Sequence, residues 1–199
     1  MNKFVPALRA GLLLACLSVL SACVSITAAK GTVPLAAGGY SIALEQTWSD
    51  VTALYGAQTP KARVLTLDGV LLDRLYLIGG VGPGASIVRS PLKERPSPVM
   101  RADLSLTEQV EFLTDSISAL GYKRVESTGV RPQTFGGADG VRVDYRAQTA
   151  EGLEIGGTAL LAVRAGKLNA MVFLAPQEYY YPQNIEKIEA VFRSATFGK

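Results

Sequence analysis

Residues 153–174, LEIGGTALLAVRAGKLNAMVFL, contain two apolar runs separated by a turn. Ala165-Gly166-Lys167 lies between the runs and has the composition of a turn, so we expect residues 153–163 and 168–174 to form a β-hairpin. The second run is almost wholly apolar around Met171. This composition favours a central place in the sheet, because a half-exposed strand alternates apolar with polar residues.

Further strands are predicted on both sides of this hairpin. Residues 62–67 and 70–78 are apolar runs joined at Asp68-Gly69, a strong turn dipeptide. Residues 141–146 alternate apolar with charged side chains, the pattern of a half-exposed strand. Shorter strands are expected at residues 40–44 and 122–126, and the glycine-rich segment 79–84 is expected to end the strand before it.

Two segments have the periodicity of amphipathic helices. Ser105 and Glu108 form the pattern of a capping box, and Gly121 is a typical C-terminal stop. Between them runs an apolar stripe of Leu106, Val110, Leu113, Ile117 and Leu120. A closing helix is predicted over residues 182–194, with a proline in its first turn. This order predicts an α+β domain: an antiparallel sheet of about five to seven strands with two helices packed on one face.

The segment 105–197 resembles the PsbP-like fold. The resemblance rests on element order and on three stretches, GGADGVR at 136–142, FLAP at 173–176 and AVFRSATF at 190–197. It implies the α+β architecture described above. Members of this fold are mostly binding or assembly factors without catalytic chemistry, so the resemblance implies a non-catalytic role and carries over no site residue.

The N-terminal segment has the layout of a secretory signal peptide. Lys3 and Arg9 precede an apolar run over residues 10–20, which is shorter than the roughly 20 apolar residues that span a bilayer. Leu20-Ser21-Ala22-Cys23 resembles the lipobox of bacterial lipoproteins. The resemblance implies that residues 1–22 are a lipoprotein signal peptide and that Cys23 is acylated, with palmitate among the acyl groups. A plain cleaved signal is the alternative.

Cleavage at the lipobox would leave a mature chain that starts at Cys23. Residues 23–38 are rich in Ala, Thr, Gly and Ser, so we expect a lipidated flexible tether before a single domain over residues 39–199. Val24 carries no inner-membrane retention signal, and the resemblance therefore implies a lipid anchor in the outer membrane, on its periplasmic face. Loss of the two leader cations lowers the formal net charge from +3 to +1, which does not suit a nucleic-acid partner.

The chain contains no histidine. This absence excludes Ser-His-Asp and Cys-His catalysis and the usual imidazole zinc sites. Because Cys16 would leave with the leader, Cys23 is the only thiol expected in the mature chain. We therefore expect no cofactor, no metal site and no enzymatic activity. Two alternatives stay open, a histidine-free, carboxylate-dependent hydrolase of the envelope and a carrier of small apolar ligands.

Two surfaces are candidates for binding. Tyr179, Tyr180 and Tyr181 can form an amphipathic contact surface, and the alternative is that one or two of the rings cap the core beneath the last helix. Residues 89–101 form a proline-rich polar loop that carries Arg95 and Arg101. The sequence thus predicts a membrane-anchored periplasmic lipoprotein, a non-catalytic binding or assembly module with a protein partner in the envelope.

Overall fold

The hairpin predicted at residues 153–174 lies near the middle of a large antiparallel sheet. The computed structural model describes residues 26–90 and 96–198, so the leader, Cys23 and Arg95 lie outside the described residues. Across these ranges the sheet has nine strands in the order β1-β2-β3-β4-β8-β7-β6-β5, and β9 pairs with β2. The count exceeds the five to seven strands predicted, because β1 and the two-residue β9 were not expected.

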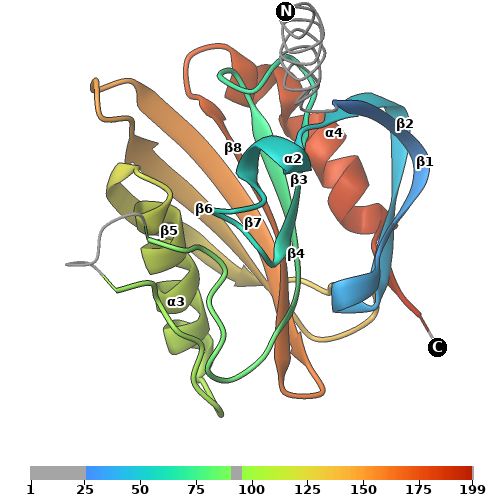
Figure 1. Cartoon of the computed structure of the whole chain (residues 1–199), viewed down its shortest axis with the longest axis vertical. Coiled ribbons are helices and arrows are strands. Elements are labelled where there is room, and N and C mark those ends of the chain that lie inside the picture. The colour runs from blue at the N-terminus through green and yellow to red at the C-terminus, as the bar shows by residue number, and fades with distance from the viewer. Residues whose placement is uncertain (1–25, 91–95, 199) are drawn as a thin grey trace, which may run out of the picture.

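The strands are β1 (Thr27–Leu35), β2 (Tyr40–Asp50), β3 (Ala62–Thr66), β4 (Arg74–Val81), β5 (Lys123–Pro132), β6 (Val141–Gln148), β7 (Glu154–Arg164), β8 (Lys167–Pro176) and β9 (Thr196–Phe197). The helices are the 3-10 turn η1 (Ala36–Gly38), α2 (Thr52–Tyr55), α3 (Leu106–Ala119) and α4 (Tyr180–Ser194). Every pairing is antiparallel, and Figure 1 shows the strands with α3 and α4. None of the helices in the described ranges is both long and apolar enough to cross a membrane.

Strand β8 is covered on both faces, which places the two long helices on opposite sides of the sheet. Ala170, Val172 and Leu174 belong to the core that includes α3, whereas Met171 and Phe173 belong to the core that includes α4. The prediction of two helices on one face is therefore wrong. The physical reason is the apolar run itself, because a strand that is apolar on both faces needs a cover on each.

The segment predicted as a flexible tether is largely folded. β1 and η1 occupy residues 27–38, and β1 pairs with β2 from Thr27 to Leu35. Ala29 and Val33 are buried in the core beside α4. The tether prediction is therefore wrong from Thr27 onward. The strand was missed because Gly31 and Pro34 interrupt the alternation that marks a strand.

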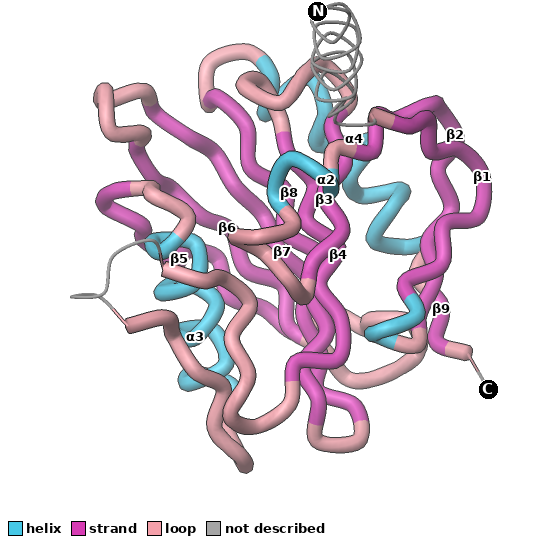
Figure 2. The backbone as a smooth tube through the Cα atoms, viewed as in Figure 1, coloured by secondary structure: helices cyan, strands magenta, loops and turns pink. Residues whose placement is uncertain are grey.

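The β1–β2 hairpin leaves the sheet and packs over α4. β2 pairs with β3 only through Ser49 and Asp50, and its first residues pair with β9. Figure 2 shows the hairpin curling away from the other strands on the side where α4 lies. α4 consequently lies between two layers of strand, and Ile42, Trp48 and Val191 share one core with the sheet.

Helix α3 begins as its sequence predicts. The Ser105 hydroxyl accepts a hydrogen bond from the Glu108 N–H, and the Glu108 carboxylate accepts one from the Ser105 N–H, which confirms the capping box. Val110, Leu113 and Ile117 are buried as expected. Leu106 is the first residue of the helix and is 61% exposed, so the apolar stripe begins one turn later than predicted.

Candidate functional site

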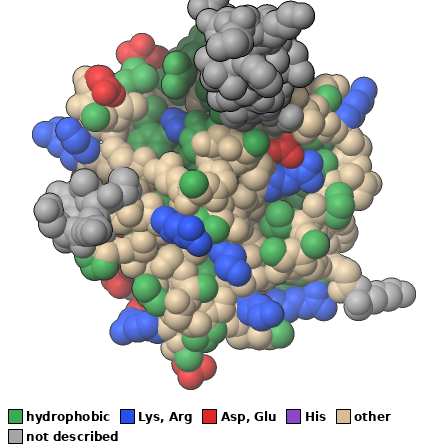
Figure 3. Space-filling model, in the orientation of Figure 1, with side chains coloured by type: hydrophobic (Ala, Val, Ile, Leu, Met, Phe, Trp, Pro, Cys, Tyr) green, Lys and Arg blue, Asp and Glu red, His purple; other side chains and the backbone are tan. Residues whose placement is uncertain are grey.

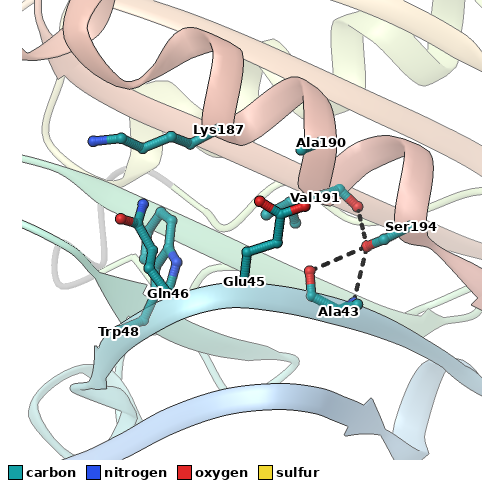
Figure 4. Close-up of a pocket in the computed structure, with 8 residues that line it drawn as sticks. All are labelled: Ala43, Glu45, Gln46, Trp48, Lys187, Ala190, Val191 and Ser194. Atoms are coloured by element: carbon teal, nitrogen blue, oxygen red, sulfur yellow. Dashed lines mark hydrogen bonds between the residues drawn. The ribbon is translucent and has the colours of Figure 1, made fainter.

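A groove lies between β2 and α4, where the β1–β2 hairpin meets the helix, and is called the β2–α4 groove below. The register between the two strands shifts there: Ala29 pairs with Trp48, and Gly31 pairs with Leu44. Three residues of β2, 45–47, therefore oppose a single residue of β1, which makes this a β-bulge. Bulges bend a strand, re-aim its side chains and occur often beside functional sites. Here the side chains of Glu45 and Gln46 lie at the groove (Figure 4).

The groove has an apolar floor and a polar rim. Its volume is about 230 Å³, and its lining comes from β2 and α4: Ala43, Glu45, Gln46, Trp48, Lys187, Ala190, Val191 and Ser194. Trp48 and Val191 are buried and form the floor. Glu45 projects from β2 toward α4, and Lys187 extends from α4 on the Gln46 side (Figure 4). Pockets for small organic ligands measure roughly 300–1,000 Å³, so this groove is smaller than most of them.

Ser194 closes one end of the groove. Its hydroxyl accepts a hydrogen bond from the Ala43 N–H at 2.9 Å and donates to the Val191 carbonyl at 2.7 Å. The hydroxyl also lies 3.3 Å from the Ala43 carbonyl. A strand that turns away from its sheet leaves backbone groups to be satisfied, and Ser194 supplies a partner for those of Ala43. The serine thus holds β2 against α4.

Lys187 is fixed by a short chain of polar groups. Its Nζ donates to the Asn184 Oδ1 at 2.8 Å, and the Asn184 amide donates to the Asp68 Oδ2 at 2.6 Å. Asn184 is fully buried, so this chain ties α4 to the β3–β4 loop. The lysine is thereby held in place at the groove, which lowers the entropy that it would lose on meeting a partner.

Ser194 and Lys187 in the groove are not arranged as a catalytic nucleophile and its general base. Ser194 and Lys187 are seven residues apart on one helix, a separation of about 10 Å along the axis. A general base must lie within hydrogen-bond reach of the nucleophile, at about 2.6–3.2 Å. The Ser194 hydroxyl instead bonds backbone groups, and Lys187 bonds Asn184.

The three predicted tyrosines divide between surface and core. Tyr179 is 62% exposed, and its ring meets that of Tyr180 edge to face at 5.0 Å between centroids. Tyr180 and Tyr181 are partly buried against the α4-side core. Tyr181 stacks on Phe173 and donates a hydrogen bond to the Gly157 carbonyl at 3.3 Å. Burial, together with the charge of Asp144, raises the pKa of Tyr181. Tyr179 is the most exposed of the three, and the binding role of the tyrosines stays a prediction.

Of the two predicted arginines, Arg101 lies within the described residues. It is exposed and forms an ion pair of 2.6 Å with Glu108. Both line a shallow groove of about 250 Å³ beside α3 that also holds Glu111 and Asp115. This groove is the place to test the hydrolase alternative, because three carboxylates line it. The hydrogen bonds from Ser105 and the charge of Arg101 lower the pKa of Glu108, whereas a general acid needs a raised one.

The described residues offer little to the carrier alternative. The apolar cavity between α3 and the sheet, lined by Tyr76, Ile87 and Leu113 among others, measures about 10 Å³. That is about the space needed to hold a single water molecule. Within the same ranges, no group of three acidic or thiol side chains is placed to hold a metal ion.

The sequence did not single out the residues of the β2–α4 groove. Trp48 was the one visible signal, as the only tryptophan of the chain. The bulge that exposes Glu45 and Gln46 depends on the pairing of β2 with β1, a strand that was itself not expected.

Comparison with known proteins gives the fold. No family model matches the chain, and no curated protein matches it. Among solved structures, the chain is similar to the solution structure of cyanobacterial PsbP (CyanoP) from Synechocystis sp. PCC 6803, with a TM-score of 0.55 at 15% sequence identity. The match covers 90% of this chain and 96% of that one. The domain has the PsbP-like fold.

The PsbP-like fold extends further than the sequence indicated. The resemblance in the sequence covers residues 105–197, whereas the structural match covers 90% of the chain. A second solved structure, LpqN, involved in cell envelope biogenesis of Mycobacterium tuberculosis, has a TM-score of 0.37 at 9% identity and covers 90% of this chain and 88% of that one. At 15% identity the first match defines the architecture, and the site has to be argued from this chain's own residues.

Proposed function

We propose that this chain is a non-catalytic binding or assembly module of the cell envelope, held at the membrane by a lipid on Cys23. The observation that carries the binding role is the groove at the β2 bulge. It combines a buried apolar floor at Trp48 with opposite charges at Glu45 and Lys187. An apolar pocket ringed by polar groups is the usual anatomy of an anchoring point in a protein–protein interface.

The fold of β1 sharpens the anchoring proposal. Cys23 lies four residues before Thr27, where β1 begins, so the two Cα atoms are at most about 14 Å apart. A domain attached in this way would stay close to the bilayer and would meet partners in or beside the membrane. Location at the outer membrane, on its periplasmic face, is part of the same proposal and rests on the residue after the lipobox cysteine.

Substitution of Cys23 by alanine is expected to abolish lipid attachment. The Cys23 thiol is the group that receives the diacylglyceryl unit in the lipobox mechanism, and acylation of the new amino group follows that step, so incorporation of labelled palmitate should fall to background. Cys16→Ala is the matched control and should leave labelling unchanged. Gradient separation of the two membranes then locates the labelled protein. Persistent labelling of the Cys23→Ala chain would contradict the anchor, and labelled protein in the inner membrane would contradict the outer-membrane location.

A photo-crosslinking side chain placed at Gln46 is expected to capture a specific envelope protein in cells. The same group at Glu126, an exposed position of β5, serves as the control. Filling the groove with Ala190→Trp should reduce the Gln46 product by about ten-fold, because a tryptophan there occupies the space that a partner's side chain needs. Equal products from Gln46 and Glu126, or a Gln46 product that survives Ala190→Trp in a folded protein, would show that the groove is not the binding site.

A further inference from the structure

Arg74 lies in a frame of three tyrosines on the α3 side of the sheet. Its guanidinium carbon is 6.0 Å from the ring centre of Tyr55 and 5.6 Å from that of Tyr122. Tyr76, two residues along β4, packs edge to face with Tyr55 at 6.5 Å. The frame therefore draws on three separate segments: α2, β4 and the residues that follow α3.

The cation of Arg74 has no counter-ion. Within residues 26–90 and 96–198, the ion pairs of the domain engage Arg63, Arg101, Arg131 and Arg142, and no carboxylate pairs with Arg74. Its Nε is buried and has no hydrogen-bond partner. The residue as a whole is half-buried. An arginine presents five donors in a planar fork, and here no carboxylate of the described residues accepts from that fork, whose neighbours are the three tyrosines.

The tyrosines add neutral donors to this cation. Tyr76 is 2% exposed, and its hydroxyl is also buried without a partner. Burial raises the pKa of Tyr76 and Tyr122, so both hydroxyls keep their protons at neutral pH. A buried donor that lacks an acceptor is unfavourable, and an anion at this place would supply acceptor atoms.

The surroundings favour an anion as well. Figure 3 shows the face on which α2 and α3 lie, and Lys and Arg side chains spread across its middle while Asp and Glu side chains lie mainly near its edges. A surface of one charge raises the local concentration of ligands of the opposite charge. This face therefore favours anionic ligands over cationic ones.

We propose that Arg74, with the hydroxyls of Tyr55, Tyr76 and Tyr122, forms a binding site for a phosphate group. The planar fork of arginine matches the oxygens of phosphate in geometry, and hydrogen bonds between charged groups are the strong ones. The site is separate from the β2–α4 groove, since it lies on the opposite face of the sheet. It goes beyond the proposed function and does not depend on it.

The position of the site allows two sources of phosphate. A row of paired residues, Thr27, Asp50, Leu65 and Leu75, crosses from the start of β1 to the residue beside Arg74. Three strand spacings of about 4.8 Å separate the ends of this row. The site thus lies close to the point where the chain leads to Cys23. A lipid headgroup and a free phosphate or phosphomonoester are both within reach of this chemistry.

Calorimetric titration of the full chain in detergent tests the site with two probes. Inorganic phosphate represents the free source, and dihexanoyl phosphatidylglycerol, a soluble phosphodiester lipid, represents the headgroup. We expect saturable binding of at least one probe, and Arg74→Gln should weaken it by about ten-fold or more. Binding of phosphate alone assigns the free source, whereas binding of the lipid alone or of both includes the headgroup.

Matched variants separate loss of the binding site from loss of charge elsewhere and from loss of folding. Arg146→Gln removes the same charge from an exposed position of β6 and should leave the affinity unchanged. Tyr76→Phe removes one hydroxyl and no ring, so it should weaken binding even if Arg74→Gln does not fold. The proposal is overturned if neither probe binds, if Arg146→Gln weakens binding as much as Arg74→Gln, or if neither Arg74→Gln nor Tyr76→Phe changes the affinity.

Discussion

Replacement of Glu189 by alanine is expected to lower the free energy of unfolding by about 3 kcal/mol. Arg142 is buried beneath α4, and both of its terminal amino groups donate to the Glu189 carboxylate. Its Nε donates to the Thr158 hydroxyl at 2.6 Å, and its guanidinium lies 4.7 Å from the ring centre of Phe192. Removal of one partner of a buried pair costs about 3–5 kcal/mol when the remaining charge is uncompensated, and here Asp144 Oδ1, 3.6 Å from the Arg142 Nε, remains as a second counter-charge. We expect the lower end because the Glu189 side chain is 32% exposed.

Urea unfolding followed by the fluorescence of Trp48, which is buried and is the only tryptophan, measures this loss. Glu186→Ala, at an exposed position of the same helix, is the control and should change stability by less than about 0.5 kcal/mol. The double variant Arg142→Met with Glu189→Leu should recover most of the loss, since an apolar pair of similar size can replace a buried ion pair. A loss below about 1 kcal/mol for Glu189→Ala would contradict the assignment.

Arg142 also shows where prediction from the sequence ends. The alternation at residues 141–146 identified the strand, and β6 confirms it. The same alternation placed the charged side chains on a solvent-exposed face, whereas α4 covers Arg142 on that face. The covering carboxylate of Glu189 is 47 residues further along the chain, and no local pattern connects the two.

Local signals predicted the elements that depend on local physics. The capping box at Ser105 fixes the start of α3, and the turn at Ala165-Gly166, where both residues have positive φ, fixes the register of β7 and β8. These interactions join residues only a few positions apart. The β2–α4 groove needs Glu45 and Lys187 to meet across 142 positions, so it could be found only with the fold in hand.

The glycines that follow the apolar part of β4 do not end the strand, as the sequence predicts, but lie within it. The sequence predicts that residues 79–84 end the strand, yet β4 continues through Gly79 and Gly80 to Val81. The turn η1, which joins β1 to β2, packs directly on this pair. A Cβ at Gly79 would lie 2.6 Å from the Gly38 Cα. The glycines therefore allow two backbones to cross, and this crossing holds the β1–β2 hairpin against the sheet.

Substitution of Gly80 by alanine is expected to destabilise the fold by about 2–5 kcal/mol. Gly80 has a φ of +66°, a left-handed conformation that costs other residues about 1–2 kcal/mol. A Cβ there would also collide with the carbonyl oxygen of Ala37, a backbone atom that cannot move without its turn. Overpacking of this kind adds about 1–3 kcal/mol.

The control for Gly80→Ala is Gly166→Ala in the β7–β8 turn. Gly166 has a similar φ of +71°, and a Cβ there meets nothing within 4 Å. It should therefore lose only the conformational part, about 1–2 kcal/mol. Urea unfolding of both variants isolates the contribution of the crossing. Equal losses at the two positions would mean that η1 does not press on β4, and that the hairpin which forms one wall of the β2–α4 groove is held by α4 alone.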